Sequence, residues 1–271
     1  MDPAAARTWL FVPGNRPDRF AKAAASGADC VLLDLEDAVA PDQKDVAREA
    51  VAQSLRTGAQ AWVRVNSAGT PEHELDLQAL AGLPGLLGVM LPKAEAAAEI
   101  RHVTGQAGTG VVPLLESAVS LLGALDLARA EGVVRLAFGS VDYAGDLGAE
   151  HVAEALLLAR STLVLVSRAA GLPGPIDGVT TAIDDAAAVL ADTVRARRLG
   201  MTGKLVIHPR QLAAVAEGFA PDPEEVRWAR AVVDAVQGER GAVQVDGALV
   251  DAPVLARARA VLADAGATGR S

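Results

Sequence analysis

The feature that most constrains this chain is a repeated alternation of short apolar runs with alanine- and leucine-rich stretches of helical spacing. It extends from the first residues to about residue 217. Several of the apolar runs lack alternating polar residues, as expected of strands that are covered on both faces. Eight strands are predicted, at residues 8–12, 30–36, 61–66, 88–92, 111–116, 133–139, 175–179 and 204–208.

The spacing of these runs favours a closed barrel. The residue that ends each run recurs at intervals of 24 to 35 residues, and each interval is long enough for one strand and one helix. Eight such units with right-handed crossovers can close into an α/β (β/α)8 fold, the TIM barrel, which typically takes about 250 residues. The chain has 271. A doubly wound open sheet is the structural alternative, whereas a solenoid is disfavoured because no residue pattern recurs between units.

The pattern changes after residue 219. A helix is predicted to begin near Pro221, followed by a hairpin that turns at Asp246-Gly247 and by a last helix at 253–265. We therefore predict a catalytic barrel at residues 1–219 and a C-terminal helix-hairpin-helix extension at residues 220–271. The extension is too short to be expected to have a core of its own. It would act as a lid or as an oligomerisation arm that reaches a neighbouring subunit.

Charge and composition exclude several classes of function. Asp and Glu outnumber Lys and Arg by 34 to 25, and no dense basic stripe occurs, which argues against nucleic acid or an anionic membrane as a partner. The N-terminus lacks the features of a signal peptide, and no stretch is long enough to span a bilayer, so we expect a cytoplasmic protein. The single cysteine, Cys30, lies in an apolar run and is predicted to be buried and unreactive.

Two carboxylates stand where a barrel would place its active site. The C-terminal ends of the strands meet at one mouth, and Glu116 and Asp142 follow the fifth and sixth predicted strands. Facing each other, they would repel unless a divalent cation lay between them, and oxygen ligands with open positions suit Mg²⁺. The alternative is that each carboxylate caps the helix that follows its strand.

Basic residues gather at the same end of the predicted barrel. Arg64 closes the third strand and could hold a substrate carboxylate through two parallel hydrogen bonds, form a buried ion pair with Glu36 or Asp37, or do both. Arg16, Arg19 and Lys22 lie in and just after the first loop and suit phosphates or a second carboxylate. For Arg19 taken alone, a place on a solvated helix face is the favoured interpretation.

Two further residues at strand ends have competing interpretations. Lys93 could form a Schiff base at the barrel mouth, but a charge partner for Glu36 or Glu95 is the favoured interpretation. His208 is predicted to be structural, because the four histidines do not show the spacing of a metal site.

Several motifs in register resemble the citrate lyase β-subunit-like family, within the HpcH/HpaI aldolase and malyl-CoA lyase superfamily. They begin with Leu-Phe-Val-Pro-Gly-Asn-Arg-Pro at residues 10–17 and Leu-Asp-Leu-Glu-Asp at residues 33–37. Further motifs follow in order at residues 63–66, 90–93, 115–117, 138–142, 203–209 and 247–253. The resemblance covers essentially the whole chain. The pair Val141-Asp142 resembles the malyl-CoA-lyase-like members.

The resemblance implies a TIM-barrel lyase, usually a trimer or hexamer, which makes or breaks a carbon–carbon bond between acetyl-CoA and a 2-oxo acid. The CoA thioester would be a 3-hydroxyacyl-CoA such as citramalyl-CoA or malyl-CoA. Glu116 and Asp142 would ligate Mg²⁺, and Arg64 would bind the carboxylate of the oxo acid. By the same resemblance, Asp37 would support the metal's waters, and Asp251 would enter the active site of a neighbouring subunit. Three residues would line the approach of CoA: Phe11, Arg16 and Lys22.

Two other activities stay open at this point. One is a metal-dependent aldolase that acts on free 2-oxo acids without CoA. The other is a citrate lyase β subunit that depends on an acyl-carrier partner.

Overall fold

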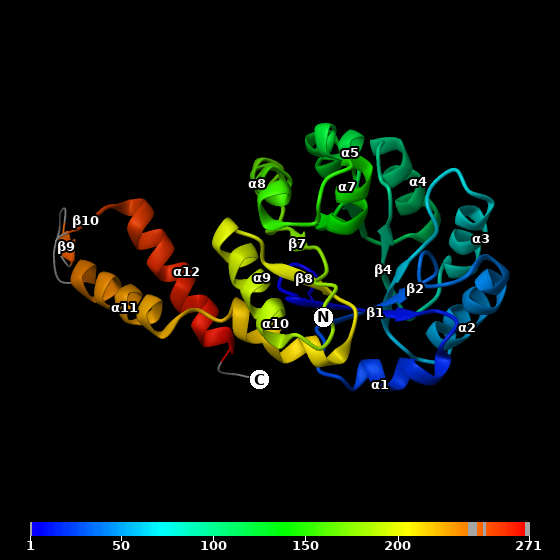
Figure 1. Cartoon of the computed structure of the whole chain (residues 1–271), viewed down its shortest axis with the longest axis horizontal. Coiled ribbons are helices and arrows are strands. Elements are labelled where there is room, and N and C mark those ends of the chain that lie inside the picture. Colours follow the sequence, from blue (N-terminus) through cyan, green and yellow to red (C-terminus); the bar gives the residue numbers. More distant parts are fainter. Residues whose placement is uncertain (1, 238–242, 246–247, 269–271) are drawn as a thin grey trace. The chain divides into compact units, whose positions relative to one another are not determined.

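The barrel is closed and parallel. The computed structural model describes residues 2–237, 243–245 and 248–268. Its eight barrel strands are hydrogen-bonded in chain order, and the last pairs with the first (Figure 1). The predicted (β/α)8 fold is confirmed. The strands are β1 (Thr8–Pro13), β2 (Cys30–Asp34), β3 (Ala61–Arg64), β4 (Leu86–Leu91), β5 (Val111–Leu115), β6 (Ala137–Phe138), β7 (Ile176–Asp177) and β8 (Gly203–Val206).

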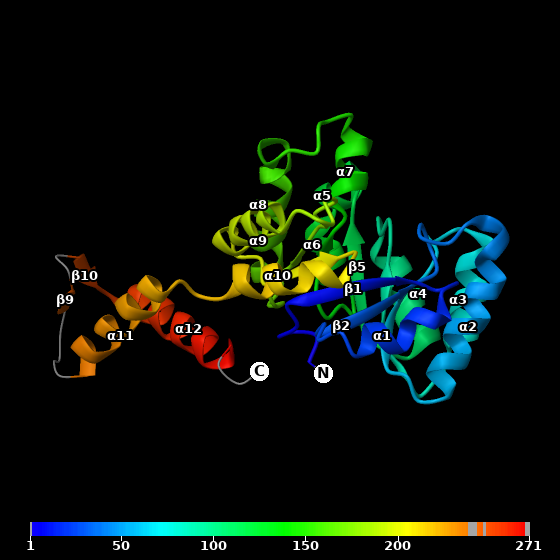
Figure 2. The same cartoon turned by 60° about the horizontal axis from the view of Figure 1, so that its bottom comes forward.

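Helices follow the strands and surround the barrel (Figure 2). Those of the barrel are α1 (Phe20–Ala24), α2 (Lys44–Arg56), α3 (Pro71–Leu80), α4 (Ala97–Ala107), α5 (Ala118–Leu122), α6 (Ala124–Ala128), α7 (Ser140–Leu147), α8 (Ala153–Ala169), α9 (Ala186–Leu199) and α10 (Leu212–Phe219). Three 3-10 turns join them: η1 (Pro17–Arg19), η2 (Pro41–Gln43) and η3 (Pro209–Gln211).

The interior of the barrel is filled by large apolar side chains that alternate along each strand. Trp9 and Trp62 meet edge to face with ring centroids 5.1 Å apart, and Leu32, Met90 and Val112 pack around them. A strand turns every second side chain to the same face. The next inward positions toward the C-terminal ends of β2 and β3 are polar, Asp34 and Arg64. After β5, Glu116 follows the inward Leu114 in the same way, and all three polar side chains lie at the barrel mouth.

The sixth strand is shorter than predicted. The expected strand covered residues 133–139, but β6 has two residues, which pair with Leu114 and Leu115 of β5 and, through Ala137, with Ile176 of β7. The charged Arg135 interrupts the run. Its buried guanidinium donates hydrogen bonds to the carbonyl oxygens of Ala6 and Gly174, among others. The segment before β6 is therefore held by side-chain hydrogen bonds and does not form a continuous backbone ladder with its neighbours.

The chain divides into two compact units, Met1–Ala216 and Glu217–Ser271. The second contains α11 (Pro223–Gln237), the antiparallel strands β9 (Val243–Val245) and β10 (Ala248–Val250), and α12 (Ala252–Thr268). The predicted turn at Asp246-Gly247 lies outside the described residues. Contrary to expectation, this unit has a small apolar cluster of its own, formed by Ala229, Val232, Val250 and Ala258, because α11 and α12 pack together.

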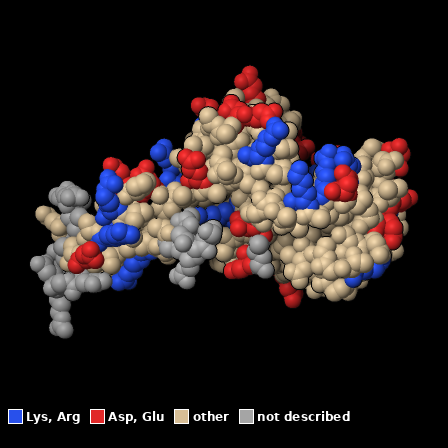
Figure 3. All heavy atoms as spheres, turned by 90° about the horizontal axis from the view of Figure 1, so that it is seen from below, with Lys and Arg blue, Asp and Glu red and all other residues tan. Residues whose placement is uncertain are grey.

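The surface charges are mixed. On the face in Figure 3, basic and acidic side chains are interspersed among uncharged ones. Among the residues that the structure describes, no helix is both long enough and apolar enough to cross a membrane.

Candidate active site

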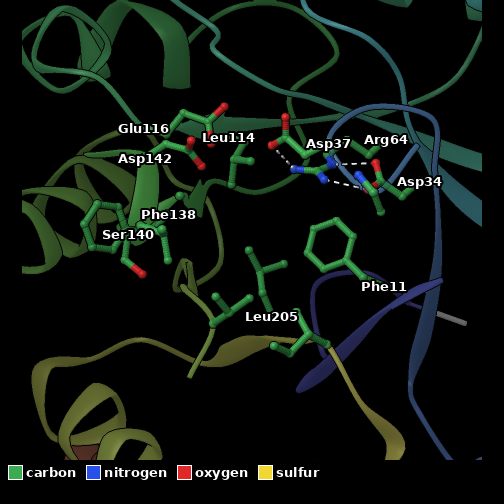
Figure 4. Close-up of a pocket in the computed structure, with 15 residues that line it drawn as sticks. Phe11, Asp34, Asp37, Arg64, Leu114, Glu116, Phe138, Ser140, Asp142 and Leu205 are labelled. Carbon is green, nitrogen blue, oxygen red and sulfur yellow. Dashed lines mark hydrogen bonds and ion pairs between the residues drawn. The ribbon is translucent and has the colours of Figure 1, made fainter. Parts of the chain in front are cut away.

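A cavity of about 330 Å³ lies at the C-terminal mouth of the barrel (Figure 4). Glu116 and Asp142 lie on one side, and Arg64 with Asp34 and Asp37 lies on the other. The remaining wall is largely apolar and is formed by Phe11, Ala38, Leu114, Phe138, Gly139, Ser140, Val141, Val179, Leu205 and Ile207. The structure therefore brings five of the predicted site residues into one pocket: Phe11, Asp37, Arg64, Glu116 and Asp142.

Glu116 is buried at the end of β5, and its two carboxylate oxygens differ in their hydrogen bonding. Oε1 accepts a hydrogen bond of 2.7 Å from the backbone N–H of Lys93, which has a φ of 48°. Oε2 is buried and has no hydrogen-bond partner among the described residues. A Cβ at Gly139 would collide with both Oε2 and the Cβ of Glu116, so glycine is required beside this carboxylate.

Asp142 completes the acidic side of the pocket. It lies in the first turn of α7, is exposed, and points toward the same space as Glu116 (Figure 4). Ser117 caps α5, and Gly139 occupies the N-cap position of α7. Neither carboxylate is therefore an N-cap, although Asp142, in the first turn of α7, is placed to interact favourably with the helix dipole.

The electrostatics of this pair match a cation site. Burial, reinforced by the charges of Glu36 and Asp142, raises the pKa of Glu116 to about 8. A buried carboxylate oxygen without a hydrogen-bond partner, facing a second carboxylate, is unfavourable unless a proton or a cation compensates it. The residues present thus fit a divalent metal ion with oxygen ligands.

The raised pKa predicts how the metal-free protein responds to pH. An unfolded glutamate releases its proton near pH 4.5, whereas folded Glu116 releases it near pH 8. Between these values the folded state binds more protons, so the contribution of Glu116 to the free energy of unfolding falls as pH rises, by on the order of a few kcal/mol. Urea unfolding in EDTA should therefore show the wild type losing stability relative to Glu116→Gln across this range. A constant difference between the two proteins would contradict the assignment.

Arg64 is held by carboxylates of the protein itself. Its Nε and Nη2 donate to the two oxygens of Asp34 at 2.7 and 2.6 Å. Its Nη1 lies 3.0 Å from Glu36 and 3.6 Å from Asp37. The predicted buried ion pair is confirmed with Glu36, whereas Asp37 is farther away and exposed. The closest partner, Asp34, was missed. The spacing of two between Asp34 and Glu36 was the available signal, because a strand that reached residue 36, as predicted, would turn both side chains to its inner face.

Lys93 is a charge partner of Glu36, which is the interpretation that the sequence favoured over a Schiff-base lysine. Its Nζ donates a hydrogen bond of 2.7 Å to Glu36. Although partial burial lowers the pKa of Lys93, the hydrogen bond and charge of Glu36 hold that pKa above its ordinary value. A Schiff-base lysine must be deprotonated to attack a carbonyl, so this environment disfavours that role.

Of the residues predicted to line the CoA approach, Phe11 lies in the pocket, whereas Arg16 and Lys22 do not line it. The ring of Phe11 lies 4.7 Å from the Arg64 guanidinium carbon, inside the pocket. Arg16 is exposed and forms two hydrogen bonds with Asp18, and Lys22 is exposed on α1. Asp251, predicted for proton transfer, belongs to the second unit, where its side chain accepts a hydrogen bond from Val254 at the start of α12.

Other strand-end residues serve the fold. Asp177 is fully buried and is paired with Arg160 and Lys204. His208 accepts a hydrogen bond from the backbone of Arg210, which confirms the structural interpretation. Ser140 was missed: it lines the pocket at the start of α7 and lies 2.9 Å from His151.

Comparison with known proteins gives concordant matches. The model of the HpcH/HpaI aldolase/citrate lyase family matches residues 7–209. The citrate lyase subunit beta-like protein of Mycobacterium tuberculosis is 38% identical over 277 residues, which cover 97% of each chain. Human mitochondrial citramalyl-CoA lyase is 32% identical over 93% of this chain and 83% of its own. The crystal structure of CitE from M. tuberculosis in complex with magnesium, acetoacetate and coenzyme A superposes with a TM-score of 0.88 at 38% identity, covering 97% of this chain and 99% of that one.

Proposed function

Because the chain belongs to the HpcH/HpaI aldolase/citrate lyase family and is a carbon–carbon lyase, we propose that it acts with Mg²⁺ on a 3-hydroxyacyl-CoA thioester. In the cleavage direction it would release acetyl-CoA and a 2-oxo acid, and in the other direction it would condense them. Citramalyl-CoA and malyl-CoA are the thioesters we consider first. The observation that carries the proposal is the unpaired, buried oxygen of Glu116 facing Asp142 across from Arg64 in one pocket.

Glu116 and Asp142 would hold the metal ion through their carboxylate oxygens. Mg²⁺ bound there would polarise the hydroxyl or carbonyl oxygen of the substrate and neutralise charge that develops on it. The backbone N–H of Lys93 fixes Oε1 of Glu116, so Oε2 is the oxygen left for the ion. The pocket is lined largely by apolar side chains, and such surroundings strengthen electrostatic interactions between the groups that it holds.

Arg64 would orient the carboxylate of the oxo acid. Asp34 already occupies Nε and Nη2 of Arg64, so a substrate carboxylate would approach from the Nη1 side. The most loosely held partner on that side is Asp37, whose Oδ2 lies 3.6 Å from Nη1 and whose side chain is 55% exposed. We infer that the substrate carboxylate takes the place of Asp37 beside Arg64. Asp37 would then be free to order water near the ion or to accept a proton.

A proton must also move on the acetyl carbon. Asp37 or Asp251 would serve as the acid or base for this step. Asp251 would reach the pocket of a neighbouring subunit in a trimer or hexamer, with residues 220–271 acting as the lid or arm.

The proposal is tested by assaying the isolated chain on citramalyl-, malyl- and 3-hydroxy-3-methylglutaryl-CoA, with Mg²⁺ and with EDTA. Cleavage of a free CoA thioester that requires Mg²⁺ would support it. Activity only on free 2-oxo acids would favour the aldolase alternative, and activity only with an acyl-carrier partner would favour a citrate lyase β subunit. Turnover that survives EDTA and is trapped by borohydride would overturn the metal mechanism in favour of Lys93.

The double variant Arg16→Ala/Lys22→Ala should bind the CoA thioester more weakly. The Arg16–Asp18 pair is exposed and contributes little stability, so a phosphate can replace Asp18. Losing two phosphate contacts should raise KM by about tenfold or more at an unchanged kcat. Steady-state kinetics measure this, with Arg19→Ala, an exposed arginine of the same loop, as the control. Equal KM values for wild type and double variant would argue against this CoA path.

Asp251→Asn should lower kcat by about 10² to 10⁴ with little change in the affinity for the oxo acid. Asparagine also caps helices, so the variant keeps the contact with Val254 while it removes the carboxylate. Single-turnover rates and oxo-acid binding, measured side by side, separate the two effects. A full rate in this variant would leave no catalytic role for Asp251.

A further inference from the structure

Two histidines and a glutamate come together between two neighbouring helices of the barrel. His73 and Glu74 lie near the start of α3, and His102 lies in α4. One ligand atom from each side chain lies within 4.8 Å of the others. Across residues 2–237, 243–245 and 248–268, no other group of three such residues meets this condition. The function proposed above does not use these residues.

The hydrogen bond of His73 prepares it to bind a metal. The residue is buried, and its Nδ1 lies 2.8 Å from the backbone carbonyl oxygen of Asn66. A carbonyl can only accept, so Nδ1 carries the proton and the lone pair of the neutral ring is on Nε2. Histidines that bind metals usually donate their other ring N–H to a carbonyl or carboxylate in this way, which fixes the tautomer.

The other two residues supply a nitrogen and an oxygen. Nε2 of His102 lies 2.9 Å from Oε1 of Glu74, and both side chains are about half exposed. The rings of His73 and His102 are 6.2 Å apart between centroids and tilted by 30°. Solvent can therefore reach the cluster, and a single carboxylate stands beside two imidazoles.

We propose that His73, Glu74 and His102 bind a divalent transition-metal ion of the class that prefers imidazole, such as Zn²⁺, with water completing its coordination. Two imidazole nitrogens and one carboxylate oxygen are a donor set that suits this class. The donors at the barrel mouth are carboxylates, which suit Mg²⁺, so the two sites differ in the metal they select. The bound ion would join α3 to α4 and, through His73, stabilise Asn66 at the end of β3.

The test is isothermal titration of the untagged, EDTA-treated full chain with Zn²⁺ in excess Mg²⁺, which keeps the carboxylate site saturated. His102→Asn and Glu74→Gln change exposed positions and should leave the fold intact. His208→Asn is the matched control, because that histidine lies outside the cluster. Thermal unfolding of each protein with and without Zn²⁺ provides a second readout that does not depend on enzyme activity.

We expect one Zn²⁺ site per chain in the wild type and in His208→Asn, together with a higher Tm in Zn²⁺. In His102→Asn and Glu74→Gln the Kd should rise by at least about tenfold, and the gain in Tm should shrink. The proposal is overturned if these two variants bind Zn²⁺ as the wild type does, or if His208→Asn loses as much affinity as they do.

Discussion

Replacing Asp142 with alanine is expected to abolish Mg²⁺ binding at the barrel mouth and to lower kcat/KM by about 10³ or more. Glu116 would then be the single protein carboxylate left to bind the ion, which is too few protein ligands to hold it beside the substrate. Asp142 is exposed and caps no helix, so the fold should survive. Circular dichroism, Mg²⁺ titration and steady-state kinetics check the three expectations.

Asp146→Asn is the matched control for this prediction. Asp146 is an exposed acid of the same helix, α7, outside the pocket. It accepts a hydrogen bond from the backbone of Ala118, which asparagine can also accept. We expect near-normal activity in this control. Near-normal turnover in Asp142→Ala would contradict the assignment of Asp142 as a ligand of the metal ion.

Replacing Arg64 with alanine should give the largest loss of stability, about 3–5 kcal/mol of the free energy of unfolding. The change leaves Asp34, which is 0% exposed, and Glu36, which is 5% exposed, without the guanidinium that compensates them. Substrate binding would be lost as well, but urea unfolding measures the stability effect separately. Arg16→Ala, which breaks an exposed pair, should leave the free energy of unfolding almost unchanged.

The double variant Arg64→Ala/Asp34→Ala separates the charge effect from the loss of packing. If the buried carboxylate causes the loss, removing Asp34 as well should cost much less than the sum of the two single changes. Additive losses would mean that the pair is not coupled. That result would contradict the assignment of Asp34 as the anchor of Arg64.

The barrel and much of its site could be predicted because both follow from local patterns. The apolar runs locate all eight strands. The period of two along a strand then turns Phe11, Arg64 and Glu116 to the interior, and the parallel arrangement brings the strand ends together. Except in β1, the predicted strands end one or two residues too late. At β2 and β5 the reason is that inward polar residues, Glu36 and Glu116, continue the pattern beyond the last residue of the strand.

Contacts between distant segments could not be predicted in the same way. Asp34 ends β2 and Glu36 lies two residues beyond it, and the sequence does not reveal which of them Arg64 contacts most closely. The backbone N–H of Lys93 reaches Glu116 only because Lys93 adopts a left-handed conformation, which no residue pattern indicates. The meeting of His73 with His102 likewise depends on how α3 and α4 pack.

The most direct test of the central claim is a crystal structure grown with Mg²⁺ and pyruvate. We predict one magnesium ion with oxygens of Glu116 and Asp142 at about 2.0–2.1 Å, and the pyruvate carboxylate on Arg64. A structure in which these two carboxylates point away from each other, or in which the ion binds elsewhere while the substrate occupies the pocket, would contradict the account.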